Sequence, residues 1–452
     1  MVVGDIPVRV DVAVLGAGPG GYAAAIRAAQ LGKDVVIIDP NPPGGVCLRQ
    51  GCIPAKSLLA ASHRFRQAAE SAHMGISAAP QLDWPQMQRW KDGIVTRLSG
   101  GVRRLLKDNG VEWVAGRGKF VSTTELHVET DHSAEHYIFE QAIIATGADP
   151  AELPGLPFDG VRVLTPAQAL QITELPASVA VAGSGYIAAE LAALFANLGC
   201  GVRLLIPAGE DFLPEFDPAA GRRLLVALKK QGVAVQKNVA DLSAAAGDAD
   251  LVAACGAALP RSGRLQLARA GVQPDARGAI PVNAQMQTTN PAIFAVGDVT
   301  GGSPLAHVAL KQGKVAAETL AGLPAAFEPQ AVPRVVWTEP QVAAVGLTAA
   351  QAEAAGYRVQ RGRFPLAANG RALTLDAGDG FAQVVAEAGT EILLGATIVG
   401  PQAESLIGEA ALALEMGATL TDLAETLHPH PSPAEALQEA AEAALGIAIH
   451  IQ

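Results

Sequence analysis

Two cysteines near the start of the chain are the residues best suited to chemistry. Cys47 and Cys52 have four residues between them in the segment 44–59, GGVCLRQGCIPAKSLL, and the 452-residue chain holds only four cysteines in all. A distorted turn at a helix start can bring their Cα atoms within the ~4.4–6.8 Å that a disulfide needs. The pair is therefore a candidate redox centre, with two buried apolar thiols or half of a zinc site as the alternatives.

The residues around Cys52 favour the redox interpretation. A zinc site needs a second pair of ligands, and the neighbouring sequence offers none. Pro54 suits the first turn of a helix, and Lys56 places a cation one turn further on. The dipole at a helix N-terminus lowers the pKa of a thiol, so we expect a reactive thiolate here and no metal.

A histidine and a carboxylate near the C-terminus form a second candidate pair. His430 lies in the segment 427–435, LHPHPSPAE, where three prolines stiffen the loop and Glu435 can return to the imidazole ring. A carboxylate partner fixes the tautomer of an imidazole and raises its basicity, as a general base for a thiol requires. Taken alone, the pair could equally be a zinc or structural site, or part of a surface loop.

A glycine-rich turn precedes the cysteines and predicts a dinucleotide-binding site. The apolar run 10–15 indicates a buried parallel strand, the segment 16–21 reads GAGPGG, and an alanine-rich helix follows. A second strand, 34–38, leads to Asp39, whose carboxylate can accept hydrogen bonds from ribose hydroxyls. The three glycines that allow the turn, the approach of a pyrophosphate and the helix packing are Gly16, Gly18 and Gly21.

The same pattern occurs a second time, about 170 residues later. A strand at 179–182 is followed by the segment 183–188, GSGYIA, and by a helix that carries Glu190. Alanine is an accepted third small residue of this motif. Two such turns predict two nucleotide-binding domains and two bound dinucleotides.

The segment 44–59 resembles the active-site segment of the class I pyridine nucleotide-disulfide oxidoreductases, and the resemblance extends over nearly the whole chain. Within this family the segment is most like that of the enzymes that oxidise a dihydrolipoyl dithiol with NAD+. The resemblance implies FAD on the first turn and NAD on the second. It also implies a homodimer in which His430 of one subunit serves the cysteines of the other.

The resemblance further implies roles for single residues. Cys47 is the sulfur that the substrate thiolate attacks, and Cys52 is the sulfur nearer the flavin. Lys56 and Glu190 pair beside the flavin ring, and Tyr186 covers the nicotinamide pocket. Further implied cofactor contacts are Thr146, Gly147, Asp298 and the helix start at Ala306 for FAD, and Gly183, Gly185, Tyr186 and Ile187 for NAD.

The predicted fold is α/β, with two Rossmann-like dinucleotide-binding domains and a C-terminal α+β dimerisation domain. The expected FAD-binding domain is discontinuous, and the NAD-binding domain is inserted into it. The boundaries are 1–149 and 259–329 for the FAD-binding domain, 150–258 for the NAD-binding domain and 330–452 for the dimerisation domain.

The second nucleotide domain departs from the family pattern. The strand 202–206 is followed by Pro207 where an acid is expected for NAD, and Glu210 and Asp211 come three and four residues later, which is late for contact with a ribose. The stretch 235–250 is too short for the usual strand hairpin. An arginine that the family places after Gly256 is also missing. These changes put NAD binding in question.

Composition narrows the remaining possibilities. A net charge of −11 and an aromatic content of 4% argue against a nucleic-acid partner. We expect no secretory leader before the first strand, and the most apolar helical run, 186–198, is too short to span a bilayer, so we also expect no membrane contact. Four cysteines fit a reducing, cytoplasmic compartment.

Two other functions remain open. Another disulfide or metal-ion reductase of this fold is the first, although the tail 446–452 lacks the cysteine pair of mercuric reductases, and Pro207 is not followed at once by the basic residues of glutathione-type reductases. The second is a flavoprotein electron-transfer subunit for a lipoyl-bearing partner, with weakened NAD binding.

Overall fold

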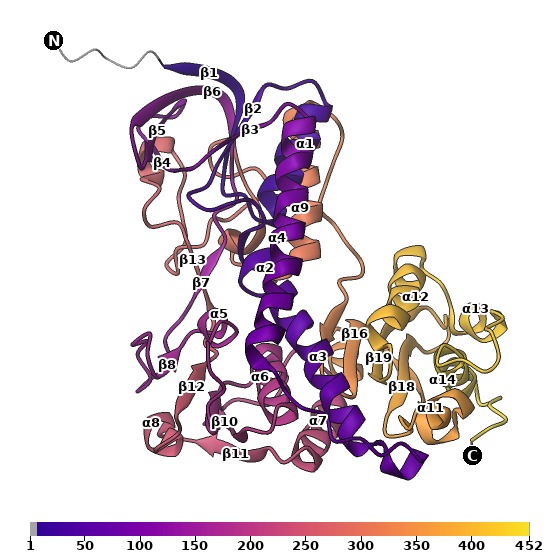
Figure 1. Ribbon diagram of the computed structural model, residues 1–452. Coiled ribbons are helices and arrows are strands. Elements are labelled where there is room, and N and C mark those ends of the chain that lie inside the picture. The colour runs from indigo at the N-terminus through magenta and orange to yellow at the C-terminus, as the bar shows by residue number, and fades with distance from the viewer. Residues whose placement is uncertain (1–6, 452) are drawn as a thin grey trace.

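The computed structural model describes residues 7–451 and contains three large sheets and a two-stranded ribbon. In Figure 1 the first sheet lies at the upper left, the second at the lower left and the third at the right, with long helices between them. The predicted α/β fold with two nucleotide-binding sheets and a separate C-terminal sheet is confirmed. Within the described residues, no helix has the length and apolar character needed to cross a membrane.

The first sheet has seven strands in the order β3-β2-β1-β6-β5-β4, with β14 also paired to β6. Residues 12–15 of its central strand are at most 2% exposed, which is why this apolar run forms a parallel strand covered on both faces. The strands are β1 Val8–Leu15, β2 Val35–Ile38, β3 Glu112–Val114, β4 Gly116–Phe120, β5 Glu125–Thr130, β6 Ala134–Ile144 and β14 Ile293–Ala295. The helices of this part are α1 Pro19–Gln30, α2 Gly45–Arg49, α3 Cys52–Glu70, η1 Ser71–Met74, α4 Trp84–Asp108, η2 Leu267–Ala270, η3 Gly297–Thr300 and α9 Ala306–Leu320.

The second sheet has five parallel strands in the order β11-β10-β9-β12-β8. A short helix, α8, connects the last two strands of this part in sequence, which fits the stretch that is too short for a strand hairpin. The strands are β8 Val163–Leu164, β9 Ser178–Ala182, β10 Gly201–Pro207, β11 Ala234–Val239 and β12 Leu251–Ala254. The helices are α5 Pro166–Ala169, α6 Tyr186–Asn197, α7 Pro218–Lys230 and α8 Leu242–Ala246.

The third sheet is antiparallel, in the order β15-β16-β19-β18-β17, with helices packed against it. The strands are β15 Arg334–Val336, β16 Gln341–Gly346, β17 Val359–Pro365, β18 Phe381–Glu387 and β19 Leu393–Gly400. The helices are α10 Ala349–Ala354, η4 Leu366–Ala368, α11 Gly370–Thr374, α12 Ala403–Met416, α13 Leu420–Glu425 and α14 Glu435–Leu445.

The chain crosses between the first two sheets through an antiparallel ribbon. After β6 the chain forms β7 Ala148–Pro150, which pairs with β13 Ala258–Pro260. After β13 the chain returns to the first sheet at β14. The ribbon therefore lies at the expected limits of the inserted domain, although the exact boundaries stay predictions. A shared buried cluster, which includes Leu58 of α3, Phe195 of α6 and Val399 of β19, joins all three parts.

One apolar run of the sequence forms only a short strand. The run 289–299 forms a strand only at β14, residues 293–295. Just before it, the Thr288 hydroxyl accepts a hydrogen bond from the amide of Asn290, and the Asn290 side chain accepts one from the amide of Ala292. Such local side-chain bonds favour a turn over a strand, so an apolar run alone overestimates the strand.

Candidate active site

Two consecutive helices bring the cysteines together. Cys47 lies in α2 and Cys52 is the first residue of α3, and the short connection allows the amide of Gly51 to bond to the carbonyl of Val46 at 2.7 Å. One continuous helix would point side chains five positions apart in different directions. The break removes that problem and brings the two thiols close enough for each to shift the pKa of the other.

The two thiols differ sharply in acidity. The hydrogen bond from Cys47 lowers the pKa of Cys52 to about 7, against the opposing effect of burial, and the nearby Lys56 cation lowers it further. The same hydrogen bond, together with burial, raises the pKa of Cys47. A reduced pair therefore carries its negative charge on Cys52, the sulfur that the family resemblance implies is nearer the flavin.

Lys56 and Glu190 form a buried ion pair beside the cysteines. The Lys56 Nζ atom lies 3.0 and 2.8 Å from the two carboxylate oxygens of Glu190, which is only 4% exposed. The backbone amide of Trp337 donates to the same carboxylate at 3.0 Å. Lys56 also faces the rings of Tyr186 and Trp337, with its Nζ atom 6.0 and 5.9 Å from their centroids. Loss of either charge would leave the other uncompensated in a largely buried position.

The first glycine-rich turn is tightly packed at two of its glycines and open at the third. Gly16 has φ +102°, and a Cβ there would overlap the carbonyl oxygen of Ala145. A Cβ at Gly21 would overlap Gly16 itself, so α1 packs tightly on the turn. At Gly18, in contrast, the nearest atom to a Cβ is the Cα of Gly45, 3.8 Å away. This opening faces the start of α1, where free amides can bind a pyrophosphate.

Asp39 lies beside this turn, and its carboxylate accepts hydrogen bonds from two backbone amides. Its Oδ2 accepts from the amide of Ala17, and its Oδ1 accepts from the amide of Asn41, both at 2.8 Å. The carboxylate is thus held next to the glycines, at the carboxyl end of β2. Oδ1 also lies 3.5 Å from the Nδ2 atom of Asn41, whereas Oδ2 has one donor among the described residues and can accept a second hydrogen bond from a ribose hydroxyl.

The other residues that the family resemblance assigns to FAD lie in three turns or helix starts. The Thr146 hydroxyl donates to the carbonyl of Arg261 at 2.8 Å, and Gly147, with φ +73°, accepts from the Arg261 amide at 2.9 Å. Asp298 lies in η3, where burial raises the pKa of its carboxyl group and its charge reaches Cys47. α9 begins at Ala306 without a side-chain cap, which leaves amides free at its first turn.

The second glycine-rich turn is also formed as expected. Gly183 has φ +144°, and a Cβ there would lie 2.9 Å from the carbonyl oxygen of Cys255, whereas nothing lies within 4 Å of a Cβ at Gly185. α6 begins immediately afterwards at Tyr186, and burial raises the pKa of this phenol. Ile187 is half-buried against the neighbouring core. The open position at Gly185 again fits a pyrophosphate at a helix start.

His430 and Glu435 lie together as the sequence predicts. The Nδ1 atom of His430 is 2.7 Å from Oε1 of Glu435, and the amide of Ser432 donates to Oε2 at 2.7 Å. Burial opposes ionisation of Glu435, but the bonds from Ser432 and His430 bring its pKa below the usual value. The imidazole side chain is 81% exposed, so its Nε2 atom is open to a substrate.

Within one chain the histidine is not joined to the cysteines. The loop that carries His430 precedes α14, at the right of Figure 1, whereas α2 and α3 lie near its centre. Among the hydrogen bonds and ion pairs of residues 7–451, His430 has Glu435 as its partner and contacts neither Cys47 nor Cys52. In a single chain the cysteine pair and the His430–Glu435 pair therefore lie apart from each other.

Sequence reasoning assigned no role to His428, which anchors the histidine loop. Its side chain is 6% exposed, its Nε2 lies 2.9 Å from Oε1 of Glu409 in α12, and its Nδ1 lies 2.9 Å from the carbonyl oxygen of Thr426. The available signal was its position two residues before His430 in the same proline-rich loop.

Comparisons with known proteins agree with this geometry. Residues 10–313 match the family model described as pyridine nucleotide-disulphide oxidoreductase, and residues 332–441 match the dimerisation domain of the same family. The chain belongs to the pyridine nucleotide-disulphide oxidoreductases. The family predicted from the cysteine segment is therefore confirmed.

Several relatives of this oxidoreductase match along its whole length. It is 44% identical to the dihydrolipoyl dehydrogenase of Geobacillus stearothermophilus, covering 100% of this chain and 99% of the relative. It is 41% identical to the dihydrolipoyl dehydrogenase of Bacillus subtilis, covering 100% of both. Among solved structures, LpdA from Mycobacterium tuberculosis has a TM-score of 0.88 at 28% identity, with 96% of this chain and 99% of that chain covered.

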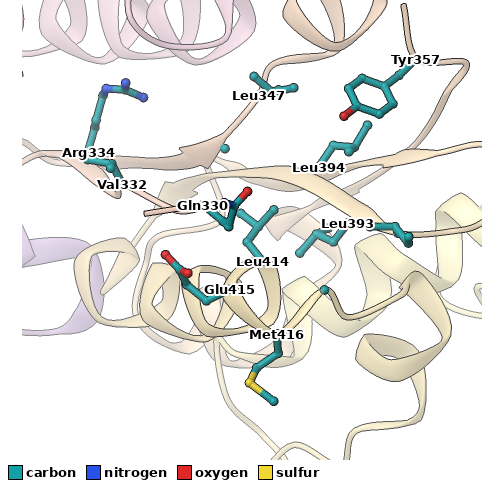
Figure 2. A pocket seen from close by; sticks show the side chains of 13 residues that line it. Gln330, Val332, Arg334, Leu347, Tyr357, Leu393, Leu394, Leu414, Glu415 and Met416 are labelled. Carbon is teal, nitrogen blue, oxygen red and sulfur yellow. The ribbon is translucent and has the colours of Figure 1, made fainter. Parts of the chain in front are cut away.

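A hollow in the third part of this oxidoreductase lies apart from all of these residues. It has a volume of about 750 Å³, and Arg334, Tyr357 and Met416 are among the residues around it (Figure 2). None of the predicted catalytic or cofactor-binding residues lines it. The cysteine pair and the glycine turns, not this hollow, therefore define the candidate active site.

Proposed function

We propose that the protein is a dihydrolipoyl dehydrogenase that oxidises a dihydrolipoyl dithiol with NAD+. The observation that carries this proposal is the position of Cys52 next to Cys47 and beside the Lys56–Glu190 ion pair, where Cys47 and Lys56 lower the pKa of Cys52 to about 7. Full-length similarity to proteins named dihydrolipoyl dehydrogenase supports the same reaction. The open turns at Gly18 and Gly185 fit the two dinucleotides, FAD and NAD.

The thiol chemistry needs only residues of the cysteine segment and of the His430–Glu435 pair. In the proposed reaction His430, held by Glu435, removes a proton from a substrate thiol, and the thiolate attacks Cys47. The Cys47–Cys52 disulfide breaks and leaves Cys52 as a thiolate, which Lys56 stabilises. The second substrate thiol then displaces Cys47, which closes the substrate disulfide and reduces the protein pair. FAD, when bound, supplies the two-electron relay from this pair to NAD+.

A homodimer completes the site, and the matched dimerisation domain supports this assembly. We propose that the exposed imidazole of His430 reaches the cysteine pair of the second subunit, because within one chain the two are not in contact. We further propose that the substrate dithiol is carried by a lipoyl-bearing protein and that the enzyme is cytoplasmic. The low cysteine content supports that location.

Anaerobic reduction of the FAD-loaded protein tests the proposal. Both dihydrolipoamide and NADH are expected to bleach the flavin absorbance, and dihydrolipoamide is expected to reduce NAD+ in steady-state turnover. Bleaching by dihydrolipoamide alone would favour the electron-transfer subunit. Bleaching by NADH alone would refute the proposal and point to another disulfide reductase.

A further inference from the structure

In the second sheet, a tight turn follows β10, the strand that comes after α6 in the chain. The acid expected for NAD binding is missing at the end of this strand. β10 ends at Pro207, and the amide of Glu210 donates back to the carbonyl of Pro207 at 3.3 Å. Gly209 occupies the turn with φ +78°, a conformation that glycine adopts without strain. The chain reverses within these four residues, so Glu210 is much closer to the strand end than its sequence position suggests.

The segment that follows the turn is bonded to the glycine-rich turn on two sides. The hydroxyl of Ser184, which lies between Gly183 and Gly185, donates to Oε2 of Glu210 at 2.6 Å. The backbone carbonyl of the same serine accepts from the amide of Leu213 at 2.9 Å. These two bonds hold the Glu210 carboxylate beside the fingerprint turn. Glu210 is nevertheless exposed, so a ligand can reach it.

We propose that Glu210 is the carboxylate that binds the adenosine ribose of the nicotinamide cofactor. A dinucleotide whose pyrophosphate lies at the start of α6 places this ribose near the end of the second strand, where a carboxylate accepts its hydroxyls. Ile206 and Pro207 cannot act as such acceptors with their side chains. Among the hydrogen bonds of residues 7–451, Oε2 of Glu210 bonds to Ser184, and Oε1 takes part in none. Oε1 can therefore bond to the ribose.

The same carboxylate selects NAD over NADP. The additional 2′-phosphate of NADP would meet the negative charge of Glu210, with Asp211 as the next residue in the chain. The turn 207–211, PAGED, contains no lysine or arginine that could compensate a phosphate charge. The sequence places these acids too late for a ribose, and the reversal at Gly209 is the physical reason why that expectation does not hold for Glu210.

This inference deepens the proposed function, and it can be tested without the dithiol reaction. ADP-ribose and 2′-phospho-ADP-ribose carry the adenosine halves of NAD and NADP, and isothermal calorimetry on the FAD-loaded protein measures their dissociation constants. Wild type is expected to prefer ADP-ribose. Glu210→Gln keeps the size of the side chain but removes its charge, and it is expected to reduce this preference at least ~10-fold, as loss of one charged contact implies.

Asp211→Asn provides the matched control. It removes the same charge from the adjacent exposed position, and Asp211 makes no bond to Ser184 in the described structure, so the preference is expected to change by less than about threefold. An equal change in both variants, an unchanged ratio in Glu210→Gln, or a wild type that binds neither compound would overturn the inference. Failure of dihydrolipoamide to reduce the flavin would refute the proposed function alone, because neither compound tests Cys47 or His430.

Discussion

At the scale of single residues, the charge on Cys52 is the property on which the thiol chemistry depends. Its pKa of about 7 lies below that of a free thiol, because Cys47 donates a hydrogen bond to it and the Lys56 cation lies nearby. A lowered pKa means that the thiolate dominates above pH ~7 and is lost as the pH falls through that value. The reduced enzyme should therefore hold one thiolate at neutral pH.

Replacement of Lys56 tests this arrangement. Lys56→Met removes the cation that lowers the pKa of Cys52, so we expect the thiolate to appear at higher pH than in wild type. Thiolate absorbance, titrated as a difference between the reduced and oxidised FAD-loaded proteins, gives the measurement. Lys56→Arg keeps the charge and serves as the control. An unchanged titration in Lys56→Met would show that Lys56 does not lower the pKa of Cys52.

Substitution of Glu190 should lower the free energy of unfolding more than a typical surface substitution does. Its carboxylate is 4% exposed and accepts bonds from Lys56 and from the amide of Trp337. Glu190→Gln leaves the ammonium uncompensated, and we expect a decrease of roughly 3 kcal/mol in the free energy of unfolding. Urea denaturation measures it. Lys56→Met combined with Glu190→Gln should lose less than the two single changes added together, and strict additivity would contradict the pairing.

At the scale of elements, the loop before α14 and the first turn of that helix form the proposed general base. His430→Gln is expected to lower turnover of dihydrolipoamide by at least ~10²-fold, the lower end for general-base catalysis, with reduction of the flavin by NADH unchanged. His450→Gln is the matched control, because His450 also pairs with a glutamate of α14, Glu439, in an exposed position. Equal losses in both variants would argue against a special role for His430.

At the scale of the whole molecule, the proposed sharing of the site between two subunits predicts complementation between two inactive variants. Cys47→Ser and His430→Gln should each be inactive as homodimers. After the two proteins are unfolded and refolded together, a mixed dimer contains one site with both native residues, and activity should return to on the order of a quarter of wild type for random pairing. Steady-state turnover measures it, and refolding each variant alone is the control. No recovery would place both residues in one chain.

The sequence predicted the parts of the site that depend on local pattern. The glycine turns at Gly16 and Gly183 and the pair His430–Glu435 are set by residues close to one another in the chain. Contacts between residues far apart in the chain could not be predicted from local sequence patterns. The Lys56–Glu190 pair joins residues 134 positions apart and came from family resemblance, and the bond from Trp337 to Glu190, across 147 positions, had no signal.

The Glu190 carboxylate has a further consequence for motion. It is held at once by α3 of the first part, by its own helix α6 and by the backbone that follows β15, so the three parts meet at one anchored point. A swing of the second sheet strains these bonds least if the hinge axis passes through that point. We therefore expect the displacement of the second sheet to be largest at its remote edge, near β8 and α8, and smallest at Cys47 and Cys52.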